Sequence, residues 1–73
     1  MARPRGYWTT PGAVNDNRQR VVRKTALPGN DHLQYVYVLH CDHCAHEYGA
    51  NGSDIWQRRC PQCQRGASGL RYR

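Results

Sequence analysis

The chain has few residues with which to build a hydrophobic core. Apart from Met1, residues 1–32 contain only four aliphatic side chains larger than alanine: Val14, Val21, Val22 and Leu27. A chain of 73 residues forms at most one domain, and a domain this small buries only about 60% of the surface that its unfolded chain exposes. We therefore expect the folded part to lie in residues 33–72. A fold of about 40 residues usually needs disulfides or a metal.

Long apolar runs are also missing. No run approaches the roughly 20 apolar residues that cross a bilayer, so the composition argues against a membrane protein. Residues 1–8 have no apolar segment of the kind found in a secretory signal. We therefore expect a cytoplasmic protein whose cysteines stay reduced, because disulfides are rare in reducing compartments.

All four cysteines fall into two short motifs, CDHC at residues 41–44 and CPQC at residues 60–63, which fifteen residues separate. Two CxxC pairs at this spacing are typical of a tetrahedral zinc site. Each pair brings two sulfurs of one turn to the same ion at about 2.3 Å, and two pairs leave no coordination position open. The sequence therefore predicts one structural Zn²⁺ with four ligands: Cys41, Cys44, Cys60 and Cys63.

Other interpretations of these residues stay open. The cysteines could form two disulfides or a redox pair, and iron could replace zinc at a four-thiolate site. A redox CxxC motif needs a helix start in a βαβ setting, which this chain cannot supply. Histidines are also metal ligands, but four thiolates already satisfy zinc. We therefore expect the four histidines to be surface residues: His32, His40, His43 and His46.

Residues 33–40 are the clearest strand in the sequence, because they are rich in β-branched and aromatic side chains and lead directly into Cys41. Residues 49–53 contain Asn-Gly and are expected to form a hairpin turn. Residues 54–59 are then expected to return to the second motif as a strand, with a short helix capped by Ser53 as the alternative. Residues 70–72 could add a short third strand.

Residues 1–32 show no persistent helical or strand period, and prolines and glycines interrupt them. We therefore expect a flexible, largely irregular basic N-terminal arm, in which residues 15–22 could form a helical turn on contact with a partner. Tyr7 and Trp8 are adjacent in this polar segment, so they either fold back onto the metal module or contact a partner.

A strand leading into CxxC, a hairpin, and a CPxC motif followed by Gly66 resemble the zinc-ribbon family over residues 33–70. Ala45 follows the first motif, where ribbons often have glycine. The resemblance implies a small metal-stabilised β fold: a zinc ribbon with a two- or three-stranded antiparallel sheet in residues 33–73, preceded by the arm of residues 1–32. Members of that family bind nucleic acid, bind other proteins, or serve as structural appendages of enzymes.

Positive charge is concentrated at the two ends of the chain. Residues 1–28 carry six cations against one acid, residues 58–73 carry five arginines and no acid, and the residues between carry four acids without Lys or Arg. Arginine binds phosphate or carboxylate in a bidentate manner, and phosphate contacts release counterions. The sequence therefore predicts binding to nucleic acid, either DNA or RNA, by eight cations: Arg18, Arg20, Arg23, Lys24, Arg58, Arg59, Arg65 and Arg71.

A second hypothesis is a protein-interaction module that docks on a larger enzyme or associates with itself. The acidic middle of the chain and the two largely apolar faces of residues 33–40 favour it. Three aromatic residues, Tyr35, Tyr37 and Trp56, are expected either to pack in the core or to stack on bases. No nucleophile and base lie together in a catalytic pattern, so we expect neither an enzyme nor a small-molecule substrate.

Overall fold

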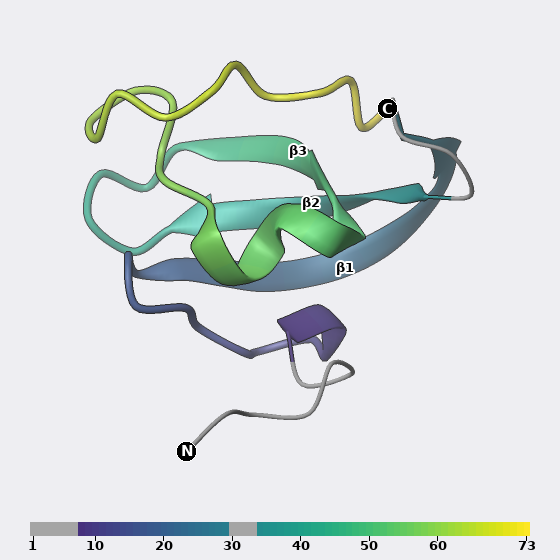
Figure 1. The fold of residues 1–73 in the computed structure, drawn as a ribbon, viewed down its shortest axis with the longest axis horizontal. Helices are drawn as coiled ribbons and strands as arrows, with labels where there is room; N and C mark the ends of the chain where they lie inside the picture. Colours follow the sequence, from purple (N-terminus) through teal and green to yellow (C-terminus); the bar gives the residue numbers. More distant parts are fainter. Residues whose placement is uncertain (1–7, 30–33) are drawn as a thin grey trace.

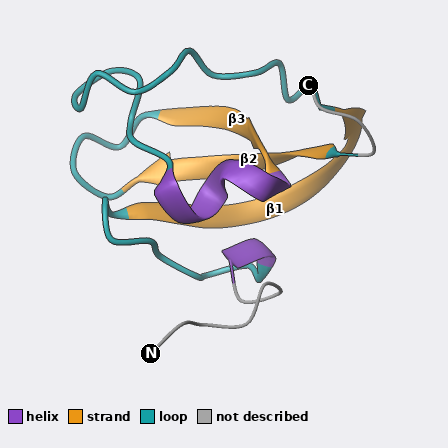
Figure 2. Cartoon of the chain, viewed as in Figure 1, coloured by secondary structure: helices purple, strands orange, loops and turns teal. Residues whose placement is uncertain are grey.

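The computed structural model describes residues 8–29 and 34–73, and all structural statements concern these residues. Three antiparallel strands form one sheet in the order β1-β2-β3. Their bounds are Gln19–Pro28 for β1, Tyr35–Cys41 for β2 and Glu47–Asn51 for β3 (Figure 1). A 3₁₀ helix, η2 (Gly52–Gln57), follows β3 and lies over the sheet (Figure 2). No helix within the described residues is long and apolar enough to cross a membrane.

Strand β1 corrects the expectation of an irregular arm over residues 1–32. It pairs with β2 from Gln19 opposite Cys41 to Pro28 opposite Tyr35. The chain before β1 pairs with the other, outer edge of this strand, because the N–H of Gly12 donates to the carbonyl of Val21 and the N–H of Val21 donates to the carbonyl of Ala13. The sheet therefore extends across the expected boundary between residues 32 and 33.

The core lies between the sheet and η2. Its buried side chains come from all three strands, η2 and the chain before β1: Ala13, Val21, Leu39, Tyr48, Ala50 and Ile55. Trp8 and Tyr37 are partly buried against this cluster. Trp8 thus packs on the fold, whereas its neighbour Tyr7 lies outside the described residues. The predicted strand before Cys41 is confirmed, because Tyr35–Cys41 is the central strand of the sheet.

The expected turn at residues 49–53 and the expected strand at residues 54–59 are wrong. Glu47–Asn51 is a strand that pairs with β2, and the chain then continues as η2. The helical alternative is the one found, although Asn51 rather than Ser53 stands at the N-cap position, with no side-chain cap bond. A tight helical turn buries Ile55 against the sheet and leaves Trp56 54% exposed. In place of a third strand after the second motif, Leu70 forms one bridge with Gly49.

We predict that Val21→Ala lowers the free energy of unfolding by about 2 kcal/mol, because two buried methyl groups are lost and a cavity remains. Val22 is the matched control: it adjoins Val21 on β1 but is 40% exposed. Val22→Ala should change that free energy by no more than about 0.5 kcal/mol. Denaturant unfolding of the metal-loaded protein measures both values. Equal effects of the two substitutions would contradict the placement of β1 in the fold.

Candidate metal centre

The two CxxC motifs meet at one end of the sheet. The four Sγ atoms all lie within 4.8 Å of one another. The Sγ atoms of Cys41 and Cys63 are 3.7 Å apart, and those of Cys44 and Cys60 are 3.6 Å apart. A tetrahedral ion with metal–sulfur bonds of about 2.3 Å needs sulfurs about 3.8 Å apart. The four side chains fit a single metal ion, and all four are free thiols rather than disulfides.

Each motif is folded by hydrogen bonds of its own backbone. The N–H of Ala45 donates to the carbonyl of Cys41 at 2.8 Å, and the N–H of Gln64 donates to the carbonyl of Cys60 at 3.1 Å. These turns place both sulfurs of a motif on the same side of the chain. The first turn leaves Ala45 in the left-handed region, with φ of 65°. A residue with a Cβ atom is strained there, and glycine is not.

The four cysteines differ in exposure. Cys41 ends β2 and Cys60 follows η2, and both are fully buried. Cys44 and Cys63 are exposed. The centre therefore has one face against the protein interior and one face toward solvent.

The side chain of Gln19 supports the buried face of the centre. Gln19 is fully buried at the start of β1. Its Nε2 lies 3.3 Å from the Sγ of Cys41, 2.8 Å from the carbonyl of Asn17 and 3.1 Å from Oε1 of Gln64. Its Oε1 accepts a hydrogen bond of 2.7 Å from the hydroxyl of Tyr48. The Gln19 amide thus connects Cys41 with the segment before β1, the segment after the second motif and Tyr48 in the core.

Two further carboxamides complete this hydrogen-bonded cluster. Gln64 donates to the carbonyl of Asn17 at 3.0 Å and accepts from the N–H of Cys60 at 2.7 Å. The buried amide of Asn15 donates to the carbonyls of Ile55 and Arg58 at 2.7 and 2.9 Å. No buried side-chain nitrogen or oxygen in the described part of the chain lacks a partner. Side chains around β1 therefore fix the second motif and the end of η2 in place.

The cysteines of this cluster differ in protonation, because burial and the neighbouring sulfurs raise the pKa of the Cys63 thiol whereas hydrogen bonds lower that of Cys41. Burial alone raises the pKa of the Cys41 thiol, but the hydrogen bonds from Gln19 and from the backbone N–H groups of Cys44 and His43 outweigh burial and lower that pKa to about 6. The thiolate, which is the form that binds metal, is therefore favoured at neutral pH. Burial raises the pKa of Tyr48, so its hydroxyl stays protonated and donates to Gln19.

The described histidines lie around the centre rather than in it. His40 Nδ1 is 3.1 Å from Oδ1 of Asp42, His43 is exposed, and the ring of His46 stacks on that of Tyr48 with centroids 5.7 Å apart. The group of described residues that could hold a metal ion contains cysteines only. His32 lies outside the described residues.

The predicted nucleic-acid contacts do not form one uniform surface. Arg20 forms an ion pair of 2.7 Å with Asp42, and its guanidinium lowers the pKa of that carboxyl. Lys24 lies over the ring of Tyr35 at 4.6 Å, and Arg71 bonds the carbonyl of Arg73. Arg58 is buried. The other four are exposed, Arg23 on β1 and three near the cysteines: Arg18, Arg59 and Arg65.

The sequence interpretation overlooked Asn15, Gln19, Tyr48 and Gln64. Gln64 directly follows the last cysteine, and that adjacency is a usable signal. Gln19 is 22 residues from its cysteine partner, and no spacing rule connects the two.

In comparisons with known proteins, no family model, no curated protein and no solved structure matches this chain. The described residues define a small module with a three-stranded antiparallel sheet and a four-cysteine cluster that could hold one metal ion.

We predict that Gln19→Leu weakens metal binding by about ten- to a hundredfold, the usual cost of losing a group that orients a metal ligand. Competition with a chelator of known affinity measures the change. Gln57→Leu is the matched control, because Gln57 is exposed. Unchanged affinity in Gln19→Leu would contradict a supporting role for this amide.

We also predict that Ala45→Gly stabilises the metal-loaded protein by up to about 1 kcal/mol. Glycine removes the strain of a left-handed residue, which costs roughly 1–2 kcal/mol, at a smaller entropic cost in the unfolded chain. Thermal unfolding measures the effect, and Ala67→Gly at an exposed position is the control. A destabilised Ala45→Gly protein would contradict the left-handed turn.

Proposed function

We propose that this chain is a ribbon-like structural zinc module that binds nucleic acid through arginines around its metal centre. Cys41, Cys44, Cys60 and Cys63 would hold one Zn²⁺ with no open position, so the ion supplies folding free energy rather than catalysis. A reducing compartment such as the cytoplasm would keep the four thiols available for the metal.

A group of exposed arginines near the cysteines supports the nucleic-acid part of the proposal. The side chain of Asn17 donates to the carbonyl of Arg58 at 3.2 Å, and the side chain of Gln64 donates to the carbonyl of Asn17 at 3.0 Å. The residues that directly follow these three are Arg18, Arg59 and Arg65, and all three are exposed. Segments far apart in the sequence thus present three guanidinium groups around one cluster.

Charge balance also favours phosphate as the partner of these arginines. Of the ion pairs among the described residues, one involves arginine, between Arg20 and Asp42. The three exposed arginines near the cysteines have no carboxylate partner there. Exposed guanidinium groups without a carboxylate partner can bind phosphate oxygens in a bidentate manner, and each such contact releases counterions.

A protein-interaction role is the second proposal. Tyr35 and Trp56 are 47% and 54% exposed, although the chain has few large apolar side chains to spare from its core. Exposed aromatic residues of this kind are enriched at protein interfaces. Tyr37, the third aromatic residue considered from the sequence, packs against the core instead.

We predict that removing zinc unfolds the sheet, because the two motifs close the fold at their end of the strands. Excess chelator should abolish the dispersed amide spectrum, and Cys60→Ser should abolish it at any zinc concentration used. His43→Ser is the matched control, since His43 lies within the first motif but is exposed. A dispersed spectrum without bound metal would contradict the structural role of zinc.

We predict that the metal-loaded chain binds single-stranded oligonucleotides with an affinity that falls steeply as salt rises. Each phosphate contact contributes about 0.7 to the slope of log affinity against log salt. Changing Arg18, Arg59 and Arg65 to Gln together should therefore lower the slope by about 2. Changing Arg23, Lys24 and Arg71 to Gln together removes the same amount of charge but should lower this salt slope by less.

Two results would contradict the nucleic-acid proposal. The first is the absence of binding at low salt. The second is an equal loss in both triple variants, because that would indicate attraction to net charge rather than to the arginines near the cysteines.

A further inference from the structure

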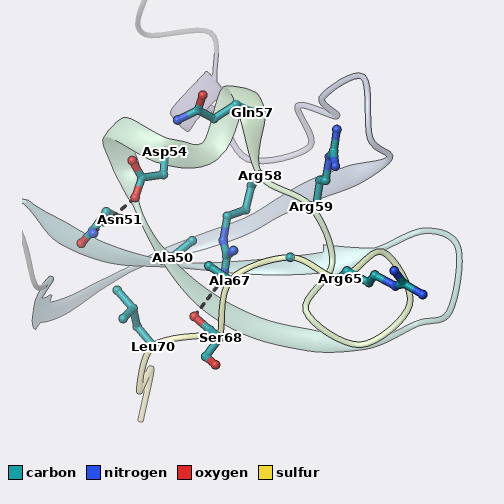
Figure 3. Close-up of a pocket in the computed structure, with 11 residues that line it drawn as sticks. Ala50, Asn51, Asp54, Gln57, Arg58, Arg59, Arg65, Ala67, Ser68 and Leu70 are labelled. Carbon is teal, nitrogen blue, oxygen red and sulfur yellow. Dashed lines mark hydrogen bonds between the residues drawn. The ribbon is translucent and has the colours of Figure 1, made fainter.

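A cleft of about 540 Å³ lies between η2 and the segment of residues 65–70 that follows the second motif (Figure 3). This volume falls within the range of roughly 300–1,000 Å³ that is usual for small-molecule sites. The cleft includes Arg59 and Arg65 of the arginine cluster, and it also has an acidic residue, Asp54, on its lining.

Arg58 occupies the middle of the cleft. It is only 8% exposed, its Nη2 donates to the carbonyl of Ser68 at 3.2 Å, and its guanidinium lies 4.9 Å from the centre of the Tyr48 ring. None of the ion pairs among the described residues involves Arg58. Burial of a guanidinium without an anion is costly, so this position favours an anionic ligand.

Arg58 has further N–H groups besides the one that bonds Ser68. Every fully buried side-chain nitrogen in the described residues has a hydrogen-bond partner. The N–H groups of Arg58 that make no protein bond must therefore keep some contact with solvent, and the cleft that they line supplies it. A phosphate in the cleft could accept two of these bonds, which are stronger than bonds between neutral groups.

The two ends of the cleft have different chemistry. Figure 3 shows Asn51 and Asp54 on one side of Arg58, and Arg59 and Arg65 on the other. The Asp54 carboxylate accepts a hydrogen bond of 3.4 Å from the side chain of Asn51. A carboxylate accepts from the exocyclic amino group of a base, as Asp and Glu do with cytosine N4. A ligand with several acids would instead meet repulsion from Asp54.

We propose that this cleft binds one nucleotide of a single strand. The phosphate of the nucleotide would contact Arg58, Arg59 and Arg65, and its base would lie toward Asp54. This inference deepens the proposed nucleic-acid function and rests on it for its biological meaning. A carboxylate at the base end makes bases with an amino group, such as cytosine, better ligands than uracil, which has none.

Titration of the zinc-loaded full chain with mononucleotides tests the site, with chemical-shift changes or calorimetry as the readout. Cytidine 5′-monophosphate should bind more tightly than cytidine, inorganic phosphate or uridine 5′-monophosphate. Arg58→Lys keeps the charge but loses the planar fork, and it should weaken cytidine monophosphate binding by about tenfold. Arg73→Lys is the matched control, because Arg73 is exposed, does not line the cleft and is not one of the eight predicted contacts.

A second variant keeps the test decisive if Arg58→Lys fails to fold. Asp54→Asn removes the carboxylate and should reduce the preference for cytidine over uridine monophosphate without weakening phosphate binding. Equal binding of inorganic phosphate and cytidine monophosphate would overturn the nucleotide site. An unchanged preference in Asp54→Asn would also overturn it.

The site and the proposed function fail in different ways. If oligonucleotides bind and mononucleotides do not, and Arg58→Lys changes neither, the cleft inference is overturned and the function stands. If cytidine monophosphate binds and loses affinity in Arg58→Lys, but oligonucleotides do not bind, the nucleotide site in the cleft stands, whereas the proposed function and a strand as the source of that nucleotide are overturned. Tighter binding of an acidic peptide than of cytidine monophosphate would overturn the cleft inference.

Discussion

The hydrogen bonds of one buried amide, Gln19, join the parts of this structure that the sequence keeps far apart. Gln19 is the first residue of β1, and its side chain donates hydrogen bonds to the sulfur of Cys41 at the end of β2 and to Gln64 after the second cysteine motif. It also accepts a hydrogen bond from the hydroxyl of Tyr48 on β3. A buried amide is costly unless its donors and acceptors are satisfied, so this arrangement tolerates few alternatives. The small core needs such specificity because six buried residues cannot by themselves fix the position of two loops.

The parts of the fold that were predicted from sequence are those with short-range signals. The four cysteines lie in two motifs, and the strand before Cys41 is a continuous apolar run. Strand β1 lacks both signals. Its register shifts between Val21 and Arg23, so Val22, Arg23 and Lys24 are exposed in succession and the alternation of period two disappears. The polar residue Gln19 is fully buried, which no hydrophobic pattern reveals.

The same limits apply to the functional residues. Charge alone assigned Arg58 to the surface with Arg59, yet burial separates these neighbours: Arg58 packs on Tyr48, and Arg59 is exposed. The extended backbone of Arg58 after η2 accounts for this, because successive side chains of an extended chain point to opposite sides. Sequence reasoning counted cations correctly but could not separate those that face solvent from one that lies within a cleft, since that difference arises from tertiary packing.

The shift in register on β1 has a consequence for the behaviour of the chain in concentrated solution. An exposed strand edge is a template for pairing with other molecules, and small sheets have two such edges. Here residues 12–14 cover the first half of the outer edge of β1. The second half carries the adjacent cations Arg23 and Lys24, and there the strand also shifts its register against β2. Irregular and charged edges oppose the regular intermolecular sheets that lead to aggregation. The register shift that makes β1 hard to predict from the sequence thus also disfavours pairing between sheets of different molecules.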